Sequence, residues 1–392
     1  MQFPQRFSDL PDYAFARLST LLDGHSPGGP EIAMSIGEPK HDAPGFVSEE
    51  IANNIAGFAK YPPNDGSPEL RAQISMWLHR RYGVQIDPQT QVVALNGTRE
   101  GLFNACVALC PQRKNGKPVN VLIPNPFYQV YAVAAAAVDA NPVFLNCPPE
   151  TGFLPDFDAL SQETLDQTAI VYLCSPSNPQ GAVADKAYWS RLINLAMQHD
   201  FLIFADECYS EIYRDIAPPG ILEVNHALNG DPERVVAFHS LSKRSNLPGL
   251  RSGFLAGGPK AVNKIKQLRS YAGAPLPLPL QHVAVRAWAD EHHVAQSRAV
   301  YIEKYNIADR VFDGCNAYNS PKAGFFLWLR VTNGIEAALK LWVETGVKVL
   351  PGAFLSRSVT GVNPGDNYIR VALVAPTQEM QRGLQSIRDC VY

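Results

Sequence analysis

Residues 235–253 have the sequence VVAFHSLSKRSNLPGLRSG. The apolar residues at its beginning predict a buried strand, which places Lys243 on the loop that follows the strand. A lysine amine in this position can form a Schiff base with an aldehyde, and the nearby Ser240 hydroxyl and Arg251 guanidinium can hold a phosphate of the same molecule. A lone lysine is more often a solvated surface residue. The Ser-x-Ser-Lys motif is therefore weak unless other segments support it.

The pattern around this stretch is one of strands alternating with helices, from about residue 67 to residue 260. A helix is predicted to begin at Ser67-Pro68-Glu69, which supplies a cap, a proline at the first helical position and a first-turn acid. Another helix is predicted at 98–109, and further strands are predicted at 91–95, 119–123, 169–173, 201–204 and 253–255. Most of these strands are continuous apolar runs, which is typical of a sheet covered on both faces. The sequence thus predicts an α/β fold that binds ligands at the carboxyl ends of its strands.

The length of 392 residues indicates two domains. We expect an amino-terminal arm with part of a small domain at 1–45, a large α/β domain at 46–285 and a smaller α+β domain at 286–392. Short strands at 325–329 and 369–373 support the α+β character of the last part. Three prolines in segment 274–280 make it a rigid stretch, which we interpret as the crossover between the domains.

The composition excludes several classes of protein. Apolar residues make up 46% of the chain and charged residues 18%, as in a folded globular protein, and the net charge of −3 indicates neither a nucleic-acid surface nor a polybasic membrane patch. No apolar stretch approaches roughly 18 residues, and Met1–Arg6 contain no secretory-signal core. Seven cysteines without C-x-x-C spacing indicate reduced thiols. We therefore expect a cytoplasmic protein without a nucleic-acid or membrane partner.

Polar residues follow the predicted strands where each strand ends. These clusters are Gly97-Thr98, Asn125-Pro126, Asn178-Pro179, Asp206 and Lys243. Each has an ordinary explanation when taken alone, such as a turn at Asn178-Pro179 or core filling by the aromatic residues after Pro126. Because the carboxyl ends of parallel strands meet at one edge of a sheet, we expect the five clusters to form a single site.

The segment Gly97-Thr98-Arg99 begins a helix directly after a strand. Free backbone N–H groups and the positive end of the helix dipole make such a helix start a phosphate cradle. Thr98 as an ordinary helix cap is the more frequent alternative. Arg99 has three open interpretations: it pairs with a phosphate, it pairs with a substrate carboxylate, or it is solvated.

Asp206 ends the predicted strand at 201–205, and Tyr209 lies three residues further on. A carboxylate against a pyridine nitrogen keeps that nitrogen protonated and makes the ring an electron sink, and a phenol can bind the ring's 3-oxygen. A metal-binding aspartate of a P-loop enzyme is the alternative, but the chain lacks a G-x-x-x-x-G-K-[ST] loop, and it also lacks G-x-G-x-x-G. Glu291-His292-His293 has no further ligands at metal-binding spacing, so we assign no metal to it.

In their order along the chain, these motifs resemble those of the fold-type-I, pyridoxal-phosphate-dependent aminotransferases of the aspartate aminotransferase superfamily. The likeness covers about residues 30 to 375 and extends to further segments, which are Ser35-Ile36-Gly37-Glu38-Pro39, Tyr61 with Gly66 and Leu70-Arg71, Pro351-Gly352 and Tyr368-Ile369-Arg370. It implies a large domain with a mostly parallel seven-stranded sheet between helices and a smaller α+β domain.

The resemblance also implies a cofactor, pyridoxal 5'-phosphate, and a role for each matching residue. Lys243 would form the Schiff base and transfer the proton, and Asp206 would pair with the pyridine nitrogen. Tyr209 and Asn178 would bind the 3-oxygen, and Tyr128 would stack on the ring. The phosphate would be held by Gly97, Thr98, Arg99, Ser240 and Arg251.

The substrate and the neighbouring subunit complete the site that the resemblance implies. Arg370 would bind the substrate α-carboxylate with help from Gly37 and Asn178, since a planar guanidinium suits a planar carboxylate. Tyr61 would reach the phosphate in the neighbouring subunit. The resemblance therefore implies a homodimer with shared active sites that acts on amino acids and 2-oxo acids.

Within the superfamily, residues 242–254 and the turn at 175–182 are most similar to bacterial succinyldiaminopimelate aminotransferases of lysine (diaminopimelate) biosynthesis. The implied reaction transfers an amino group between glutamate/2-oxoglutarate and N-succinyl-2-amino-6-oxopimelate. An aspartate- or alanine-type or other class I/II aminotransferase and a β-lyase on the same fold are the alternatives. A regulator would need an amino-terminal DNA-binding helix-turn-helix, for which the residues before Glu31 are too few. Segment 275–280 departs from the Ser/Asn-rich crossover of the superfamily, which leaves recognition of the distal substrate group open.

Overall fold

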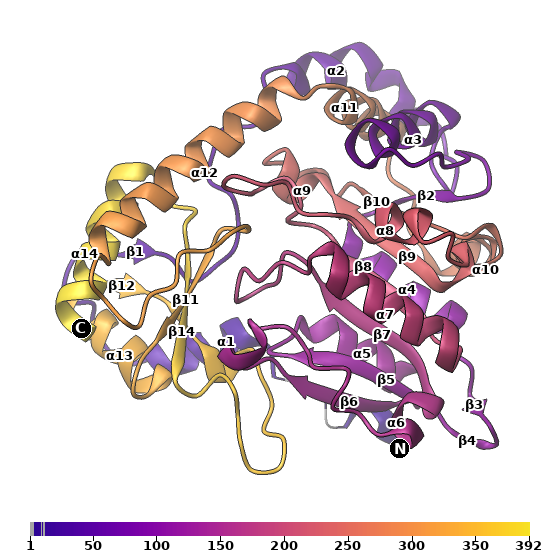
Figure 1. The fold of residues 1–392 in the computed structure, drawn as a ribbon. Coiled ribbons are helices and arrows are strands. Elements are labelled where there is room, and N and C mark those ends of the chain that lie inside the picture. Colours follow the sequence, from indigo (N-terminus) through magenta and orange to yellow (C-terminus); the bar gives the residue numbers. More distant parts are fainter. Residues whose placement is uncertain (1–3, 9, 11) are drawn as a thin grey trace.

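The apolar runs in the middle of the chain form one seven-stranded sheet (Figure 1). The structure, a computed structural model, describes residues 4–8, 10 and 12–392. Residues 1–3, 9 and 11 of the predicted arm therefore lie outside the described residues, and the first three of them belong to the segment Met1–Arg6. The strand order is β2-β10-β9-β8-β7-β5-β6, in which β10 is antiparallel to both its neighbours and the other pairs are parallel. The strands are β2 (Val92–Leu95), β5 (Asn120–Asn125), β6 (Asn141–Asn146), β7 (Thr168–Cys174), β8 (Leu202–Asp206), β9 (Val235–Ser240) and β10 (Gly253–Gly257). The predicted mostly parallel seven-stranded sheet is confirmed.

Both faces of this sheet are covered by helices, which explains why its strands are apolar throughout. Val92 and Ala94 of β2 belong to the core that contains Trp77, whereas Val93 and Leu95 belong to the core on the opposite face. The first core includes residues of α3 (Pro68–Tyr82), α7 (Lys186–His199), α8 (Ile221–Ala227) and α11 (Leu278–Ala289). The second includes residues of α4 (Thr98–Leu109), α5 (Gln129–Ala137) and α10 (Pro259–Ala272).

Two helix starts test the sequence predictions directly. Ser67 caps α3, because its Oγ accepts a hydrogen bond of 3.2 Å from the backbone N–H of Leu70, and Pro68 is the first helical residue as predicted. The alternative role of Thr98 as a helix cap is wrong. Gly97, at a φ of 85°, is the capping residue of α4, and the Thr98 hydroxyl lies 3.2 Å from Cys208 Sγ instead.

The carboxyl-terminal part forms a second layer beside the sheet, at the left of Figure 1. Its three-stranded sheet has the order β11-β14-β13, and β1 pairs in parallel with β12, so that the beginning of the chain joins its end. This layer contains β1 (Ile32–Ala33), β11 (Phe326–Arg330), β12 (Val347–Lys348), β13 (Leu350–Pro351), β14 (Tyr368–Ala372), α13 (Gly334–Thr345) and α14 (Thr377–Val391). Leu18 and Leu22 of α1 (Ala14–Leu22) pack in a core with Trp328 and Trp342 of this layer.

The remaining elements are short or lie at the margins of the two layers. They are α2 (Phe46–Asn54), β3 (Arg113–Lys114), β4 (Lys117–Pro118), α6 (Gln162–Gln167), α9 (Leu241–Arg244), α12 (His292–Val311) and 3-10 helices at Gln5–Phe7, Ile55–Ala59, Pro149–Thr151, Pro232–Arg234, Pro248–Leu250 and Gly352–Phe354.

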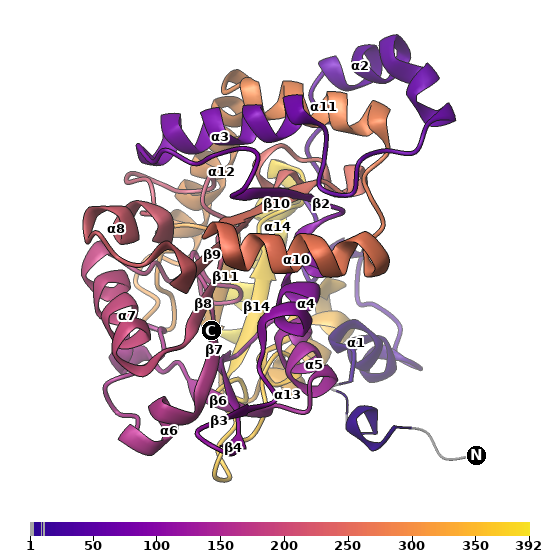
Figure 2. The same cartoon turned by 90° about the vertical axis from the view of Figure 1, so that its right-hand side faces the viewer.

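The proline-rich segment 274–280 is not itself the passage between the layers. Pro277 caps α11, and α11 packs against α2 and α3 beside the large sheet (Figure 2). The chain reaches the carboxyl-terminal layer along α12, the long orange helix of Figure 1. The expected boundary between residues 285 and 286 falls inside α11, and the domain limits 1–45, 46–285 and 286–392 stay a prediction.

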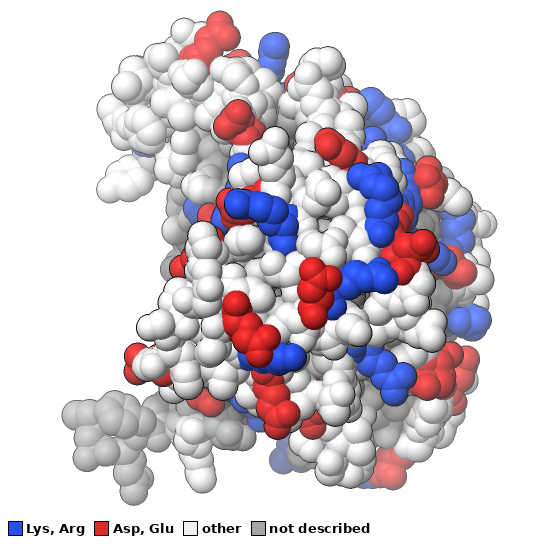
Figure 3. Space-filling view, turned by 90° about the vertical axis from the view of Figure 1, so that its left-hand side faces the viewer, with Lys and Arg blue, Asp and Glu red and all other residues white. Residues whose placement is uncertain are grey.

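On the face shown in Figure 3, Lys and Arg side chains are interspersed with Asp and Glu side chains. Within residues 4–8, 10 and 12–392, no helix combines the length and the apolar character needed to span a bilayer.

Candidate active site

A cavity of about 300 Å³ lies where the large sheet meets the carboxyl-terminal layer. Its walls include the last residues of β7, β8 and β9, so it occupies the sheet edge that the polar clusters predicted. The cavity brings together most of the predicted site residues, namely Gly37, Thr98, Arg99, Tyr128, Asn178, Asp206, Tyr209, Ser240, Lys243, Arg251 and Arg370.

Lys243 lies in α9, directly after β9, and its amine faces the cavity. Nζ donates a hydrogen bond to the Gly37 carbonyl and lies 5.3 Å from the ring centroid of Phe325. The pKa of Lys243 is lowered to about 8, chiefly by burial and also by the nearby Arg370 and Arg251, against the opposing effects of Cys208 and Glu38. Near neutral pH, this amine is therefore unprotonated far more often than an ordinary lysine.

Asp206 ends β8 and is only 5% exposed. Its Oδ2 accepts a 2.7 Å hydrogen bond from the Tyr131 hydroxyl, and its Oδ1 accepts one of 3.3 Å from the Cys208 backbone N–H. Burial raises the pKa of Asp206, and these donors oppose the rise. Among the described residues, no lysine or arginine forms an ion pair with Asp206. A cationic N–H group placed beside it would compensate the buried charge.

The amino end of α4 and the Arg251 side chain form an anion-binding corner. Gly97 has a φ of 85°, and a Cβ at this position would overlap Arg251 Nη2, so glycine lets the guanidinium lie across the helix start. Arg251 Nη1 donates to the Pro248 carbonyl at 2.8 Å. Ser240 Oγ accepts from the Ser242 backbone N–H at 3.1 Å. Backbone N–H groups, a helix dipole and a guanidinium together suit a phosphate.

Arg370, on β14, is a buried cation without a carboxylate partner among the described residues. Nη1 donates to Asn178 Oδ1 at 2.9 Å, Nη2 donates to the Ser35 carbonyl at 2.6 Å, and Nε has no partner among the described residues. The side chain is 3% exposed, and burial lowers its pKa to about 10, against an opposing effect of Tyr209. A carboxylate entering the cavity would compensate this charge.

Gly37, Tyr209 and Tyr128 line the cavity as predicted. A Cβ on Gly37 would come within 2.5 Å of Phe326 Cζ, so only glycine allows the loop to approach this closely. Tyr209 is buried, with its ring 5.3 Å from that of Phe325, and burial raises its pKa. The Tyr128 hydroxyl accepts a 2.7 Å hydrogen bond from Arg99 Nε.

Two expected participants lie elsewhere. Tyr61 is fully exposed, at 101%, and does not line the cavity of its own chain. Asn125, from the fifth polar cluster, is structural: its Nδ2 donates to Asn146 Oδ1 and to the Arg357 carbonyl, both at 2.8 Å. The cluster Asn125-Pro126 instead reaches the cavity through Phe127 and Tyr128, the two residues that follow it.

The sequence prediction missed other cavity residues. Tyr131, which binds Asp206, lies in the first turn of α5, and its ring centroid is 5.7 Å from that of Tyr128, the residue immediately before this helix. Tyr13 and Phe15 line the cavity from the amino-terminal segment. They lie far along the chain from most other lining residues, and no local sequence pattern predicts a contact between such distant residues.

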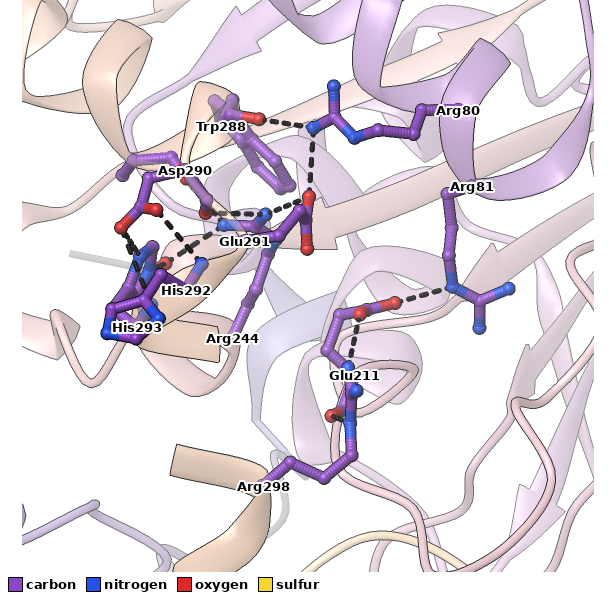
Figure 4. A network of polar contacts seen from close by, with 12 residues as sticks. Arg80, Arg81, Glu211, Arg244, Trp288, Asp290, Glu291, His292, His293 and Arg298 are labelled. Atoms are coloured by element: carbon purple, nitrogen blue, oxygen red, sulfur yellow. Dashed lines mark hydrogen bonds and ion pairs between the residues drawn. The ribbon is translucent and has the colours of Figure 1, made fainter. Parts of the chain in front are cut away.

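Glu291-His292-His293 belongs to a network of ion pairs and hydrogen bonds (Figure 4). Glu291 pairs with Arg244 at 2.7 Å and with Arg80 at 2.8 Å, and His293 Nδ1 lies 2.8 Å from Asp290. No group of three or more potential metal ligands occurs in the described part of the chain. Arg244 follows Lys243 directly, so the network anchors the turn that carries the amine.

A sequence model of the family described as "Aminotransferase class I and II" matches residues 30–387. The chain belongs to this family. Membership makes it a pyridoxal-phosphate-dependent aminotransferase of fold type I, as the resemblance implied. Its mostly parallel seven-stranded sheet matches solved aminotransferase structures of fold type I.

Three relatives place this aminotransferase among known proteins. It is 30% identical over 402 residues to the LL-diaminopimelate aminotransferase of Dehalococcoides mccartyi, with 99% of both chains covered. It superposes on an aminotransferase of Neisseria meningitidis with a TM-score of 0.94 and 35% identity over 100% of both chains. A probable N-succinyldiaminopimelate aminotransferase of Thermus thermophilus has a TM-score of 0.84 and 25% identity, with 96% of this chain and 100% of that chain covered.

Proposed function

We propose that this aminotransferase transfers an amino group between glutamate/2-oxoglutarate and an amino acid of the diaminopimelate type, with Lys243 as the catalytic amine. The observation that carries the proposal is the Arg370 guanidinium, which lacks a carboxylate partner among the described residues and is buried in the same cavity as the Lys243 amine. A reactive amine beside a carboxylate-binding cation is the arrangement that an enzyme acting on amino acids needs.

The charges of the cavity fit pyridoxal phosphate. Among the described residues that line it are the cations Arg99, Lys243, Arg251 and Arg370 but only one carboxylate, that of Asp206. The Arg251 corner, with Gly97, Thr98 and Ser240, would hold the phosphate dianion, and Asp206 would pair with the protonated ring nitrogen. Asn178 and Tyr209 would bind the ring oxygen, and Tyr128 would lie against the ring.

The bound cofactor supplies an aldehyde for an amine and a ring that withdraws electrons from the substrate α-carbon. Arg370 fixes the α-carboxylate, with Asn178 orienting one guanidinium nitrogen. The Lys243 amine, with its pKa of about 8, is suited to take a proton from the α-carbon and to return it. Gly37, whose carbonyl accepts from Nζ, holds that amine in the cavity.

Two forms of the substrate are consistent with the diaminopimelate proposal. The name of the Dehalococcoides relative favours LL-diaminopimelate itself, and that of the Thermus neighbour favours the N-succinyl form that the sequence prediction named. We take the unmodified diamino acid as the first candidate, because the relative that carries its name is the more similar in sequence. Either form places the reaction in lysine biosynthesis, and we propose the cytoplasm as its compartment.

A second subunit completes the proposal. Tyr61 is fully exposed and far from lining its own cavity, which suits a side chain that reaches the phosphate of a partner copy. We therefore propose a homodimer with shared active sites.

Substrate panels test this function. Protein loaded with pyridoxal phosphate should transfer the amino group of LL-diaminopimelate to 2-oxoglutarate, with aspartate, alanine and N-succinyldiaminopimelate as comparisons. A β-lyase would instead release a β-substituent without forming glutamate. Borohydride reduction and peptide mapping should place a pyridoxyl label on Lys243, and Lys243→Ala should lose both the label and the activity. A label on another residue would contradict the assignment.

A further inference from the structure

Lys304 is a fully buried lysine that the reaction described so far does not use. It lies on α12, the helix along which the chain reaches the carboxyl-terminal layer, and is 0% exposed. Its Nζ donates to His41 Nε2 at 2.9 Å and to the Leu373 carbonyl at 3.0 Å. Among the described residues, no carboxylate forms an ion pair with it. Because a buried cation with only neutral partners costs stability, Lys304 needs an explanation other than the stability of the fold.

The protonation of Lys304 and His41 fixes the direction of their hydrogen bond. The pKa of Lys304 is lowered to about 8, chiefly by burial and against an opposing effect of Glu303, so the amine is mainly charged near neutral pH. Burial and the charge of Lys304 lower the pKa of His41 to about 4, which keeps the imidazole neutral. An ammonium group is only a donor, so His41 Nε2 is the acceptor. The contact is therefore a charge-assisted hydrogen bond, which is stronger than one between neutral groups.

His41 ends a segment that carries two groups of the active site. We call this segment, residues 35–41, the Gly37 loop. At its beginning, the Ser35 carbonyl accepts from Arg370 Nη2 at 2.6 Å, and in its middle the Gly37 carbonyl accepts from the catalytic amine. The Gly37 loop is thus held at one end by the guanidinium that would bind the substrate and at the other end by the buried lysine.

The other contacts of Lys304 lead to the cavity wall that faces the catalytic amine. Leu373, its second acceptor, donates through its backbone N–H to the Phe325 carbonyl at 2.8 Å. Nζ also lies 5.5 Å from the ring centroid of Tyr301, and this ring lies 4.9 Å from His41 and 5.7 Å from Phe325. Phe325 is the ring beside the catalytic amine, at 5.3 Å. Lys304 therefore joins the end of the Gly37 loop to the aromatic side chains that support the site.

We propose that Lys304 is a positioning residue that acts through His41: together they fix the Gly37 loop and so orient Arg370 for the substrate α-carboxylate. The inference rests on the proposed function, because the role of Arg370 is part of it. Neither Lys304 nor His41 lines the cavity, so neither is assigned a catalytic role. The phosphate corner lies on the large sheet, so the pair should affect the binding of the substrate and not that of the cofactor.

A half-reaction with L-glutamate tests this role. Protein loaded with pyridoxal phosphate is mixed with increasing L-glutamate, and the change in cofactor absorbance gives the half-saturating concentration and the number of reacting sites. Lys304→Met removes the donor but keeps a side chain of similar length. It should raise the half-saturating concentration about tenfold, as expected for the loss of one charge-assisted hydrogen bond. A merely structural defect would instead lower the number of reacting sites and leave the half-saturating concentration unchanged.

His41→Phe tests the path from Lys304 to the Gly37 loop. It keeps an aromatic ring beside Tyr301 but removes the acceptor, so it should raise the half-saturating concentration to a similar extent. The double variant with Lys304→Met should be no worse than either single variant, because both remove the same hydrogen bond. His41→Gln keeps an acceptor and should recover most of the wild-type value. Equilibrium dialysis should show wild-type affinity for pyridoxal phosphate in all of these variants.

The control is Arg388→Gln, which removes another cation of the carboxyl-terminal layer that donates to carbonyls, those of Val311 and Asp313. It should leave the half-saturating concentration as in the wild type. An unchanged value in Lys304→Met, additive effects of the two substitutions, or an equal rise in Arg388→Gln overturns the inference, while the reaction of the wild type upholds the proposed amino transfer. A wild type that does not react with L-glutamate overturns the proposed function itself.

Discussion

Burial changes the protonation of Lys243, and this gives the uptake of cofactor a defined pH dependence. The pKa of about 8 lies below that of a free lysine. Below pH 8, the fraction of the reactive neutral amine therefore rises about tenfold with each unit of increasing pH, and above pH 8 the neutral amine is the main form. We expect the rate at which the apoprotein takes up pyridoxal phosphate to rise with pH up to about 8 and then to level off. Stopped-flow absorbance would measure it.

Pyridoxamine phosphate, which has no aldehyde, provides the control for that experiment, because its uptake should lack this rise. A rate that still increases steeply well above pH 9 would mean that the amine has the pKa of an exposed lysine.

Replacement of Arg370 is expected to lower the activity of the enzyme without lowering its stability. Because the buried guanidinium has only neutral partners among the described residues, Arg370→Gln removes an uncompensated charge and should leave the apoprotein at least as stable as the wild type. The same change should lower kcat/KM for every α-amino acid at least about 30-fold, from about 2 kcal/mol or more of lost carboxylate binding. Thermal unfolding and steady-state kinetics measure the two effects.

Arg269 offers the matched comparison, since it is equally buried but pairs with Glu100 at 2.6 Å. Arg269→Gln leaves that carboxylate without its cation and should cost about 3 kcal/mol of stability. If both variants lost stability to the same extent, Arg370 would have a structural role instead of a binding role.

At the scale of elements, α5 supports the end of β8 through one hydroxyl. Tyr131→Phe removes the donor to Asp206 Oδ2 but keeps the ring, which stacks on Tyr172 at 4.5 Å. We expect the variant to keep its fold. Its kcat should fall about tenfold, because the lost hydrogen bond contributes about 1–2 kcal/mol. The acid limb of the pH–rate profile should move to higher pH. The shift follows because the carboxylate loses a donor that lowers its pKa.

Tyr172→Phe is the control for α5, because its hydroxyl donates to the Leu102 carbonyl and not to Asp206. It should affect stability without moving the acid limb. An unmoved acid limb in Tyr131→Phe would show that the hydroxyl does not influence the catalytic carboxylate.

The sequence predicted those elements and site residues whose signal is local. β7, β8 and β9 are apolar on both faces and end in polar residues, so both the strands and the site edge follow from the pattern. β6 was not predicted, because this edge strand is partly exposed and contains Pro142. The sequence left a cap at Thr98 open as an alternative and did not indicate Gly97, since the positive φ of Gly97 and the contact of Thr98 with Cys208 are consequences of packing.

At the scale of the whole molecule, the proposed dimer places a hydroxyl of one subunit at the phosphate of the other. Tyr61→Phe should weaken binding of pyridoxal phosphate several-fold without altering the melting temperature, because the side chain is fully exposed in its own chain. Binding of pyridoxal, which lacks the phosphate, should not change. Equilibrium dialysis and sedimentation of the wild type measure affinity and mass, and a monomeric, fully active protein would contradict the shared site.

The pairing of β1 with β12 has a consequence for synthesis of the chain. Ile32 lies opposite Val347, and the Ser35 carbonyl accepts from Arg370, so the loop that carries Gly37 gains these two partners only after almost the whole chain has been translated. The seven-stranded sheet is complete in sequence at Gly257. A nascent chain therefore possesses Lys243 and the phosphate corner well before it can enclose a substrate, and these long-range contacts should form last.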